Sequence, residues 1–387
     1  MNMLERLIDL NKGTNRNRQE FWLDLAAGSS LYDELRSAIA RPNGLDWERV
    51  LDSAVKLYRD VDEGAFWKTD ASEVYDLAVE KRDRNQLIHV TKRAETPPPL
   101  WDKLGQEQNV LTDRLRRNGQ VLVALIWCAW KVWQVEFENH NLGDLLSSAE
   151  GQAKFVQALK NEMEQGRKNG TDQLVIQYED KNNLWGWIST FHEQSQPQMM
   201  MRPTTSVDFV GANPDSENLV MTLQLEILEG GTGIVFLHPA DAFKIHCDKS
   251  FAEAMVLALR AACKRLERNP AHACGRFRVF QGGKSVPQVL SGNSAGGAAF
   301  RGWYHALQGC VADPELVVLA ALKKDANGEV FGLDEVAGLE RKVLAISKLA
   351  KHDTIVVANE VQVDRVQKLL KYADSKTMIR VLAADDQ

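Results

Sequence analysis

The chain of 387 residues is long enough for about two or three domains, and its 44% apolar and 26% charged residues are typical of a globular protein. A formal net charge of -6 argues against a general nucleic-acid-binding protein. The five cysteines form no CxxC pair and no zinc-ligand spacing with histidine, so their odd number favours the reducing cytoplasm over a disulfide framework.

The sequence offers no candidate for a membrane-spanning helix. Its most apolar run, Val121–Trp130, stops at Lys131 and is too short to cross a bilayer, so we interpret it as a buried helix. Met1–Asn17 alternates charged and apolar residues and lacks the apolar core of a signal peptide. We therefore expect a cytoplasmic protein without a membrane partner.

Apolar residues recur at helical spacing along residues 1–150, which predicts a helical region. The expected helical segments are Phe21–Ile39, Trp47–Tyr58, Ser72–Ile88, Trp101–Arg117 and Val121–Phe137. Three tryptophans stand three residues apart on the last of these, at 127, 130 and 133, where core packing and a partner groove are both open. We expect residues 1–150 to recruit a partner or to regulate the rest of the chain.

Residues 151–215 are predicted to hold a helix, a hairpin and a linker. The helix is expected over Ala149–Arg167, which is amphipathic. From Gln173 the period changes to two, so Leu174–Tyr178 and Leu184–Ile188 are expected to pair as a hairpin. The following stretch, Glu193–Pro203, is rich in glutamine and methionine and is expected to be a linker.

Residues 216–387 mix strands and helices, so we expect an α+β fold with the helical region in front of this domain. Met221–Ile227 alternates apolar and polar residues, and Gly230–Gly233 is expected to turn it into a hairpin with Ile234–Leu237. The remaining expected elements are the helix Phe251–Leu266, the strands Gly275–Phe280 and Leu316–Leu322, a helix from Gly338, the strand Thr354–Ala358, the helix Val361–Tyr372 and the strand Met378–Leu382.

A run of small residues, Gly292–Ala298, carries the candidate nucleophile Ser294. Ala299, Trp303 and Leu307 follow at i, i+4 and i+8, so a helix is expected to start just after the serine. Unpaired backbone N–H groups and the positive end of the helix dipole meet at such a place, and an oxyanion needs such donors. The alternative is that Ser294 is only the N-cap residue of the helix.

The second candidate, Lys342, lies on the helix expected from Gly338. At about 100° per residue, an apolar arc of this helix encloses the lysine. The arc is formed by Leu339, Val343, Ile346, Leu349 and Ala350. A lysine in this position either extends its ammonium to water or is desolvated, and the sequence leaves both open. Desolvation would lower the pKa and give a neutral amine that can act as a base near neutral pH.

We expect no cofactor and no metal. Gly283-Lys284-Ser285 resembles the end of a phosphate-binding loop, but Arg278 stands where that motif requires a glycine. The pair His192-Glu193 lacks the second histidine of a zinc protease. The histidines at 238, 246, 305 and 352 share no ligand spacing.

The region from about Leu219 to the C-terminus resembles the proteolytic domain of the Lon proteases. Gly292-Asn-Ser294-Ala-Gly296 is similar to the nucleophile motif of that family, Gly-Pro-Ser-Ala-Gly. Gly338-Leu-Glu-Arg-Lys342 is similar to its Gly-Leu-Lys-Glu-Lys motif, whose final lysine is catalytic. The order of strands and helices around both motifs is also similar, including the expected hairpin Met221–Leu237, and the resemblance covers somewhat under half of the chain.

The resemblance implies a serine peptidase with a Ser–Lys dyad. It assigns Ser294 as the nucleophile and Lys342 as the base, with the backbone N–H groups of Asn293 and Ala295 holding the oxyanion. No ATPase module accompanies the domain, so we expect ATP-independent cleavage of a flexible loop in a specific protein partner. By analogy alone, this layout suits a bacterial signalling or defence pathway, and a homo-oligomer is left open.

The sequence also departs from the family. Asn293 replaces the usual proline, and Leu316–Val336 lacks the Thr-Gly-Glu that lies between the two motifs, with Leu319-Ala-Ala321 in its place. The missing threonine helps to position the lysine in the family. Two other functions therefore stay open: a non-catalytic binding or scaffold protein that reuses the fold, and a ligand sensor in the N-terminal half.

Overall fold

The computed structural model describes residues 2–10, 12–26, 30–40, 45–62, 100–137, 181–195, 204–211, 219–228, 233–282, 288–349, 351–372 and 379–384. The chain divides into two compact units, Met1–Met199 with Pro239–Lys244, and Met200–His238 with Ile245–Gln387. Helices and several sheets are both present, which confirms a mixed α+β protein. Within these ranges, no helix is long and apolar enough to cross a membrane.

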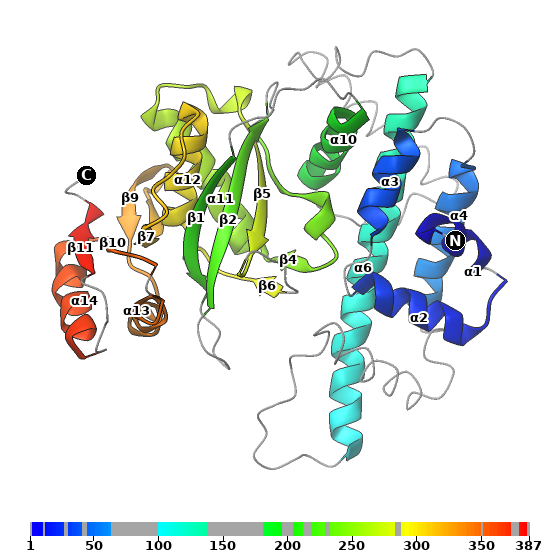
Figure 1. Cartoon of the computed structure of the whole chain (residues 1–387), viewed down its shortest axis with the longest axis horizontal. Coiled ribbons are helices and arrows are strands. Elements are labelled where there is room, and N and C mark those ends of the chain that lie inside the picture. The colour runs from blue at the N-terminus through cyan, green and yellow to red at the C-terminus, as the bar shows by residue number, and fades with distance from the viewer. Residues whose placement is uncertain are drawn as a thin grey trace. The chain divides into compact units, whose positions relative to one another are not determined.

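Helices make up the first unit in the ranges that the structure describes, apart from short connections (Figure 1). They are α1 (Met3–Leu10), α2 (Asn15–Ala26), α3 (Leu31–Ile39), α4 (Trp47–Asp62), α6 (Leu100–Phe137) and α10 (Lys181–Ser195), with the short 3-10 turn η2 (Pro239–Asp241). The long helix α6 packs against α2, α3, α4 and α10. Large aromatic side chains fill this core, among them the fully buried Trp22, Tyr58 and Trp187.

The two helices expected over Trp101–Arg117 and Val121–Phe137 form one continuous helix, α6. Gly119 lies between the two expected segments, and glycine is unfavourable inside a helix. Here its missing side chain has a packing role, because a Cβ at Gly119 would overlap Tyr58 and stand 3.1 Å from the Trp22 ring. The glycine therefore permits a close helix contact and does not end the helix.

The predicted hairpin over Gln173–Ile188 is wrong in its second half. Leu184–Ile188 lies inside α10, where Leu184, Trp187, Ile188 and Phe191 are all buried. These positions follow the i, i+3, i+4, i+7 spacing of a helix face. Over Leu184–Ile188 alone the apolar run also fits a strand, and only its continuation to Phe191 distinguishes the helical period.

The second unit is built on a four-stranded sheet in the order β1-β2-β5-β3 (Figure 1). Its strands are β1 (Thr204–Gly211), β2 (Leu219–Leu228), β3 (Val235–Leu237) and β5 (Cys274–Phe280). β2 is antiparallel to both β1 and β5, whereas β3 is parallel to β5. The expected hairpin of Met221–Leu237 is therefore wrong, because β5 pairs between the two strands.

In the described part of this unit, three smaller sheets accompany the four-stranded one. One holds β7 (Leu316–Leu319), β10 (Thr354–Val357) and β11 (Arg380–Ala383), all parallel. The others pair β4 (Ile245–Cys247) with β6 (Gln288–Leu290), and β8 (Ala321–Lys324) with β9 (Val330–Asp334). The predicted single strand Leu316–Leu322 is therefore broken at Ala320, and its two halves join different sheets.

The helices of this unit are α11 (Lys249–Arg265), α12 (Gly296–Gln308), α13 (Leu339–Ser347) and α14 (Glu360–Tyr372), with the 3-10 turn η3 (Pro270–His272). They divide between two apolar clusters. The first joins α11 and α12 to the four-stranded sheet, and the second joins α13 and α14 to the parallel sheet. Successive residues of β1 face different clusters, since Phe209 belongs to the first and Val210 to the second.

A polar cluster around the buried Asp208 and His352, with Lys351 exposed at its edge, links β1 to the start of β10. Asp208 accepts hydrogen bonds from Thr222 Oγ1 at 2.6 Å and from Lys351 Nζ, and His352 Nε2 lies 2.9 Å from its Oδ2. Burial alone would raise the pKa of Asp208, but the hydrogen bonds from His352, Lys351 and Thr222 lower it from 3.8 to about 2. The cluster thus holds the four-stranded sheet to the parallel sheet.

Replacing Asp208 by asparagine is expected to lower the free energy of unfolding at pH 7 by roughly 2 kcal/mol. Because the folded-state pKa lies below the ordinary value, this contribution is complete above about pH 4 and is lost as the pH falls toward 2. Urea unfolding of both proteins across this range measures it, with Asp364→Asn on the exposed face of α14 as control. A deficit that stays constant from pH 7 to pH 2 would contradict the assignment.

Several expected segments lie wholly or mainly outside the described residues. They are Ser72–Ile88, Ala149–Arg167, Leu174–Tyr178 and Gly283-Lys284-Ser285, with most of the linker Glu193–Pro203 and of the turn Gly230–Gly233. The boundaries proposed at residues 150 and 215 also fall among them.

Candidate active site

Ser294 stands just before α12, as the sequence predicted. The helix starts at Gly296 with Ala295 as its N-cap residue, and no side chain caps it. Ala299, Trp303 and Leu307 are buried along it. Ser294 is half-buried and does not serve as the N-cap, so the alternative role considered for it is not observed.

Backbone hydrogen bonds fix the loop around the serine. Upstream, Gly292 has a φ of +80°, a left-handed conformation that favours glycine, and its N–H donates to Asp248 Oδ2 at 3.3 Å. Downstream, the N–H of Gly296 donates to the carbonyl of Asn293 at 3.0 Å. The N–H of Gly297 donates, also at 3.0 Å, to the carbonyl of Ala320, the residue between β7 and β8. The loop is therefore attached to its surroundings on both sides of the serine.

The predicted oxyanion donors, the backbone N–H groups of Asn293 and Ala295, lie in the loop just before α12. Among the hydrogen bonds between described residues, none has the backbone N–H of Asn293, Ser294 or Ala295 as donor. Ser294 Oγ likewise makes no hydrogen bond to any described residue. These N–H groups at the start of a helix can receive a negatively charged oxygen.

Gly297→Ala is expected to lower the free energy of unfolding by about 1–3 kcal/mol, because α12 approaches the β7–β8 link closely at this point. A Cβ on Gly297 would lie 2.7 Å from the Ala320 carbonyl oxygen and 2.9 Å from Val318 Cγ1. Gly332→Ala is the matched control, since nothing lies within 4 Å of the Cβ that it adds. Equal stability of both variants in urea unfolding would contradict the close approach.

Lys342 lies in the first turns of α13, which begins after Gly338. Its side chain is 1% exposed and is among the largest fully buried ones in the described residues. Leu339, Val343 and Ile346 of the predicted arc are buried with it. Leu349 is 41% exposed and leaves the arc, and Ala350 lies outside the described residues. The lysine therefore does not extend to water.

Burial lowers the pKa of Lys342 from 10.5 to about 8, and no other cause contributes. Among the ion pairs of the described residues, none involves this ammonium. A lysine whose pKa lies near 8 is partly neutral at slightly alkaline pH. The side chain can therefore act as a general base.

Residues 319–322 contribute side chains to both apolar clusters. Ala320 and Leu322 belong to the apolar cluster that contains Ala295 of the serine loop. The neighbouring Leu319 and Ala321 belong to the cluster that contains Leu339 and Val343 of α13. Within the described residues, no hydrogen bond joins Ser294 Oγ to Lys342 Nζ, so the dyad stays a prediction.

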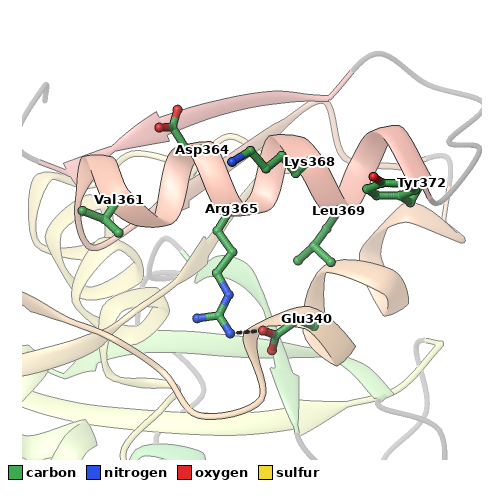
Figure 2. A pocket seen from close by; sticks show the side chains of 7 residues that line it. All are labelled: Glu340, Val361, Asp364, Arg365, Lys368, Leu369 and Tyr372. Carbon is green, nitrogen blue, oxygen red and sulfur yellow. Dashed lines mark hydrogen bonds and ion pairs between the residues drawn. The ribbon is translucent and has the colours of Figure 1, made fainter.

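A surface groove of about 420 Å³ lies between α13 and α14 (Figure 2). Its lining is Glu340, Val361, Asp364, Arg365, Lys368, Leu369 and Tyr372. Figure 2 shows Arg365 reaching from α14 to Glu340 of α13, with which it forms an ion pair. Neither Ser294 nor Lys342 lines the groove, so we do not assign substrate binding to it.

Within the described ranges, no group of three or more His, Cys, Asp or Glu side chains could hold a metal ion. His352 is buried against Asp208, as a core histidine with a hydrogen-bonded ring nitrogen.

Asp248, which touches the serine loop through Gly292, was not predicted from the sequence. Asp248 is the N-cap of α11 and accepts from the N–H of Phe251. An aspartate three residues before Phe251, the expected start of the helix, is a recognisable cap signal. Its second contact, to Gly292, has a sequence separation of 44 residues and leaves no local signal.

A scan of protein-family models finds none that matches the chain, and a search of curated proteins finds no match either.

Proposed function

We propose that the chain is an ATP-independent serine endopeptidase whose C-terminal domain has a Lon-like proteolytic fold and uses a Ser294–Lys342 dyad. The observation that carries the proposal is the buried Lys342, whose pKa falls to about 8 without an acidic partner in the described residues. A buried lysine without a partner is costly for stability, and such groups cluster at functional sites. The helical N-terminal region would recruit or regulate the protein partner.

In the proposed reaction, neutral Lys342 takes the proton from Ser294 Oγ, which attacks the carbonyl carbon of a peptide bond. The backbone N–H groups of Asn293 and Ala295 bind the oxyanion that forms. The C–N bond then breaks, and the leaving amine takes the proton from the Lys342 ammonium. Water, deprotonated by the same lysine, hydrolyses the acyl-enzyme and releases Ser294.

The substrate class proposed is a flexible loop in a specific partner protein. The chain offers no complete phosphate-binding motif to power unfolding, because Arg278 occupies the position of the first glycine. A folded protein without an exposed loop would not be cut. By analogy with this domain layout, we propose that the protein acts in a bacterial signalling or defence pathway.

The second candidate is a non-catalytic binding protein on the same fold. It is favoured by one observation, that Ser294 Oγ and Lys342 Nζ are not hydrogen-bonded to each other among the described residues. Catalytic hydrogen bonds are often long before substrate binds, so the peptidase also accommodates this geometry.

Incubation of the wild type with proteins encoded beside it is expected to give discrete fragments of one of them on a gel. Addition of ATP and Mg²⁺ is expected to leave the rate unchanged. If the chain is instead a non-catalytic binding protein, wild type and Ser294→Ala are expected to capture a partner equally, and neither cuts it. A rate that requires ATP would contradict the proposed independence.

A further inference from the structure

Asp248 connects the loop that carries Ser294 to the start of α11. Its Oδ1 accepts from the backbone N–H of Phe251 at 2.7 Å, and its Oδ2 accepts from the N–H of Gly292 at 3.3 Å. Its own N–H donates to the Leu290 carbonyl at 2.9 Å. One residue thus holds two points of the segment that leads into the serine.

Upstream, β6 ends at Leu290, which is buried and paired with β4, and beyond this strand the loop is held among the described residues by the bond from the Gly292 N–H to Asp248. Apart from its chain neighbours, no described residue lies within 4 Å of a Cβ built on Gly292, so close packing within these residues does not hold the left-handed turn. The downstream side is held separately, by the bond from the Gly297 N–H to the Ala320 carbonyl. The orientation of the backbone between these two anchors sets where Ser294 Oγ and the neighbouring N–H groups point.

We infer that Asp248 is a positioning residue for Ser294, which sets the serine and the oxyanion donors through its bond to Gly292. The inference rests on the proposed function, since it concerns the reactivity of that serine. Displacement of a reacting group by about 1 Å can cost about 100-fold in rate, so a lost anchor two residues away is expected to be costly.

Asp248→Asn separates the two contacts. The amide keeps one acceptor oxygen, which can still cap α11 through Phe251, but its NH₂ cannot accept from Gly292. Asp248→Ala loses both contacts. Asn269→Ala is the matched control, because Asn269 caps η3 through a 3.0 Å bond from the Ala271 N–H.

Two measurements test the inference on the full chain. In amide hydrogen exchange, residues 288–295 are expected to exchange faster in Asp248→Asn, with α11 unchanged. With a biotinylated fluorophosphonate, the maximal labelling rate of Ser294 is expected to fall about 10- to 100-fold, at an unchanged half-saturating concentration. Asn269→Ala is expected to match the wild type in both.

Unchanged exchange in residues 288–295, or labelling of Asp248→Asn as fast as wild type, would overturn the inference and leave the proposed function standing. If wild type is not labelled at Ser294, the proposed function fails, and hydrogen exchange alone decides whether Asp248 positions the loop.

Discussion

Ser294→Ala is expected to reduce cleavage of the partner protein by at least about 1000-fold, because the variant removes the attacking atom. Stability is expected to stay within about 0.5 kcal/mol of wild type. The side chain is half-buried, does not cap α12, and makes no hydrogen bond among the described residues. The loss of activity would therefore come from the chemistry and not from the fold.

The control is Ser291→Ala, an exposed serine in the same loop, which is expected to cleave as fast as wild type. Both variants are measured by fragment formation on a gel and by urea unfolding. Cleavage by Ser294→Ala at the wild-type rate would contradict the account. A large loss of stability in this variant would assign the serine a structural role.

Lys342→Met is expected to be inactive and yet more stable than wild type by about 3 kcal/mol at pH 7. The buried lysine binds its proton less well in the folded protein, where its pKa is about 8, than in the unfolded chain, where it is 10.5. The buried lysine therefore lowers the free energy of unfolding by its full amount below pH 8, and this loss disappears as the pH rises toward 10.5. The neutral methionine has a similar volume and avoids this cost.

Urea unfolding of wild type and Lys342→Met from pH 7 to 10.5 measures this difference, which is expected to shrink as the pH rises. Lys348→Met, at an exposed position just after α13, is expected to show no such difference. Lys342→Arg is also expected to be inactive, because a guanidinium stays charged and cannot act as a base. Equal stability of Lys342→Met and wild type at every pH would mean that the lysine reaches water.

Periodicity predicted the elements that have one buried face. The spacing of Leu339, Val343 and Ile346 predicted α13 and placed Lys342 within its apolar arc. The same spacing after Ser294 predicted α12. Periodicity alone could not decide whether the lysine ammonium reaches water, since this depends on what packs against α13.

Errors arose where tertiary contacts decide the structure. Gly119 sits inside α6 because it packs against Tyr58, and the pairing of β5 between β2 and β3 brings together residues far apart in the sequence. The strands β1 and β9 were not predicted at all. In β9 all five residues are exposed or half-exposed and apolar residues do not alternate, so the local signal is weak.

In the candidate active site, too, the local features were predicted from the sequence and the long-range contacts were not. Ser294 and its helix follow from local sequence, whereas the contact of Asp248 with Gly292 and the cluster of Asp208 with His352 depend on long-range packing. Single-sequence patterns contain no signal for such contacts, because the partners share no period or motif.

The most direct test of the Ser294–Lys342 dyad is the rate at which a fluorophosphonate labels Ser294, measured against pH in wild type and in Lys342→Met. In this reaction Ser294 Oγ bonds to phosphorus, fluoride leaves, and Lys342 takes the hydroxyl proton. The account predicts a single adduct on Ser294, with a wild-type rate that rises through about pH 8 and a rate in Lys342→Met that is at least about 100-fold lower. Equal labelling of both proteins, or no adduct on Ser294 in the wild type, would contradict it.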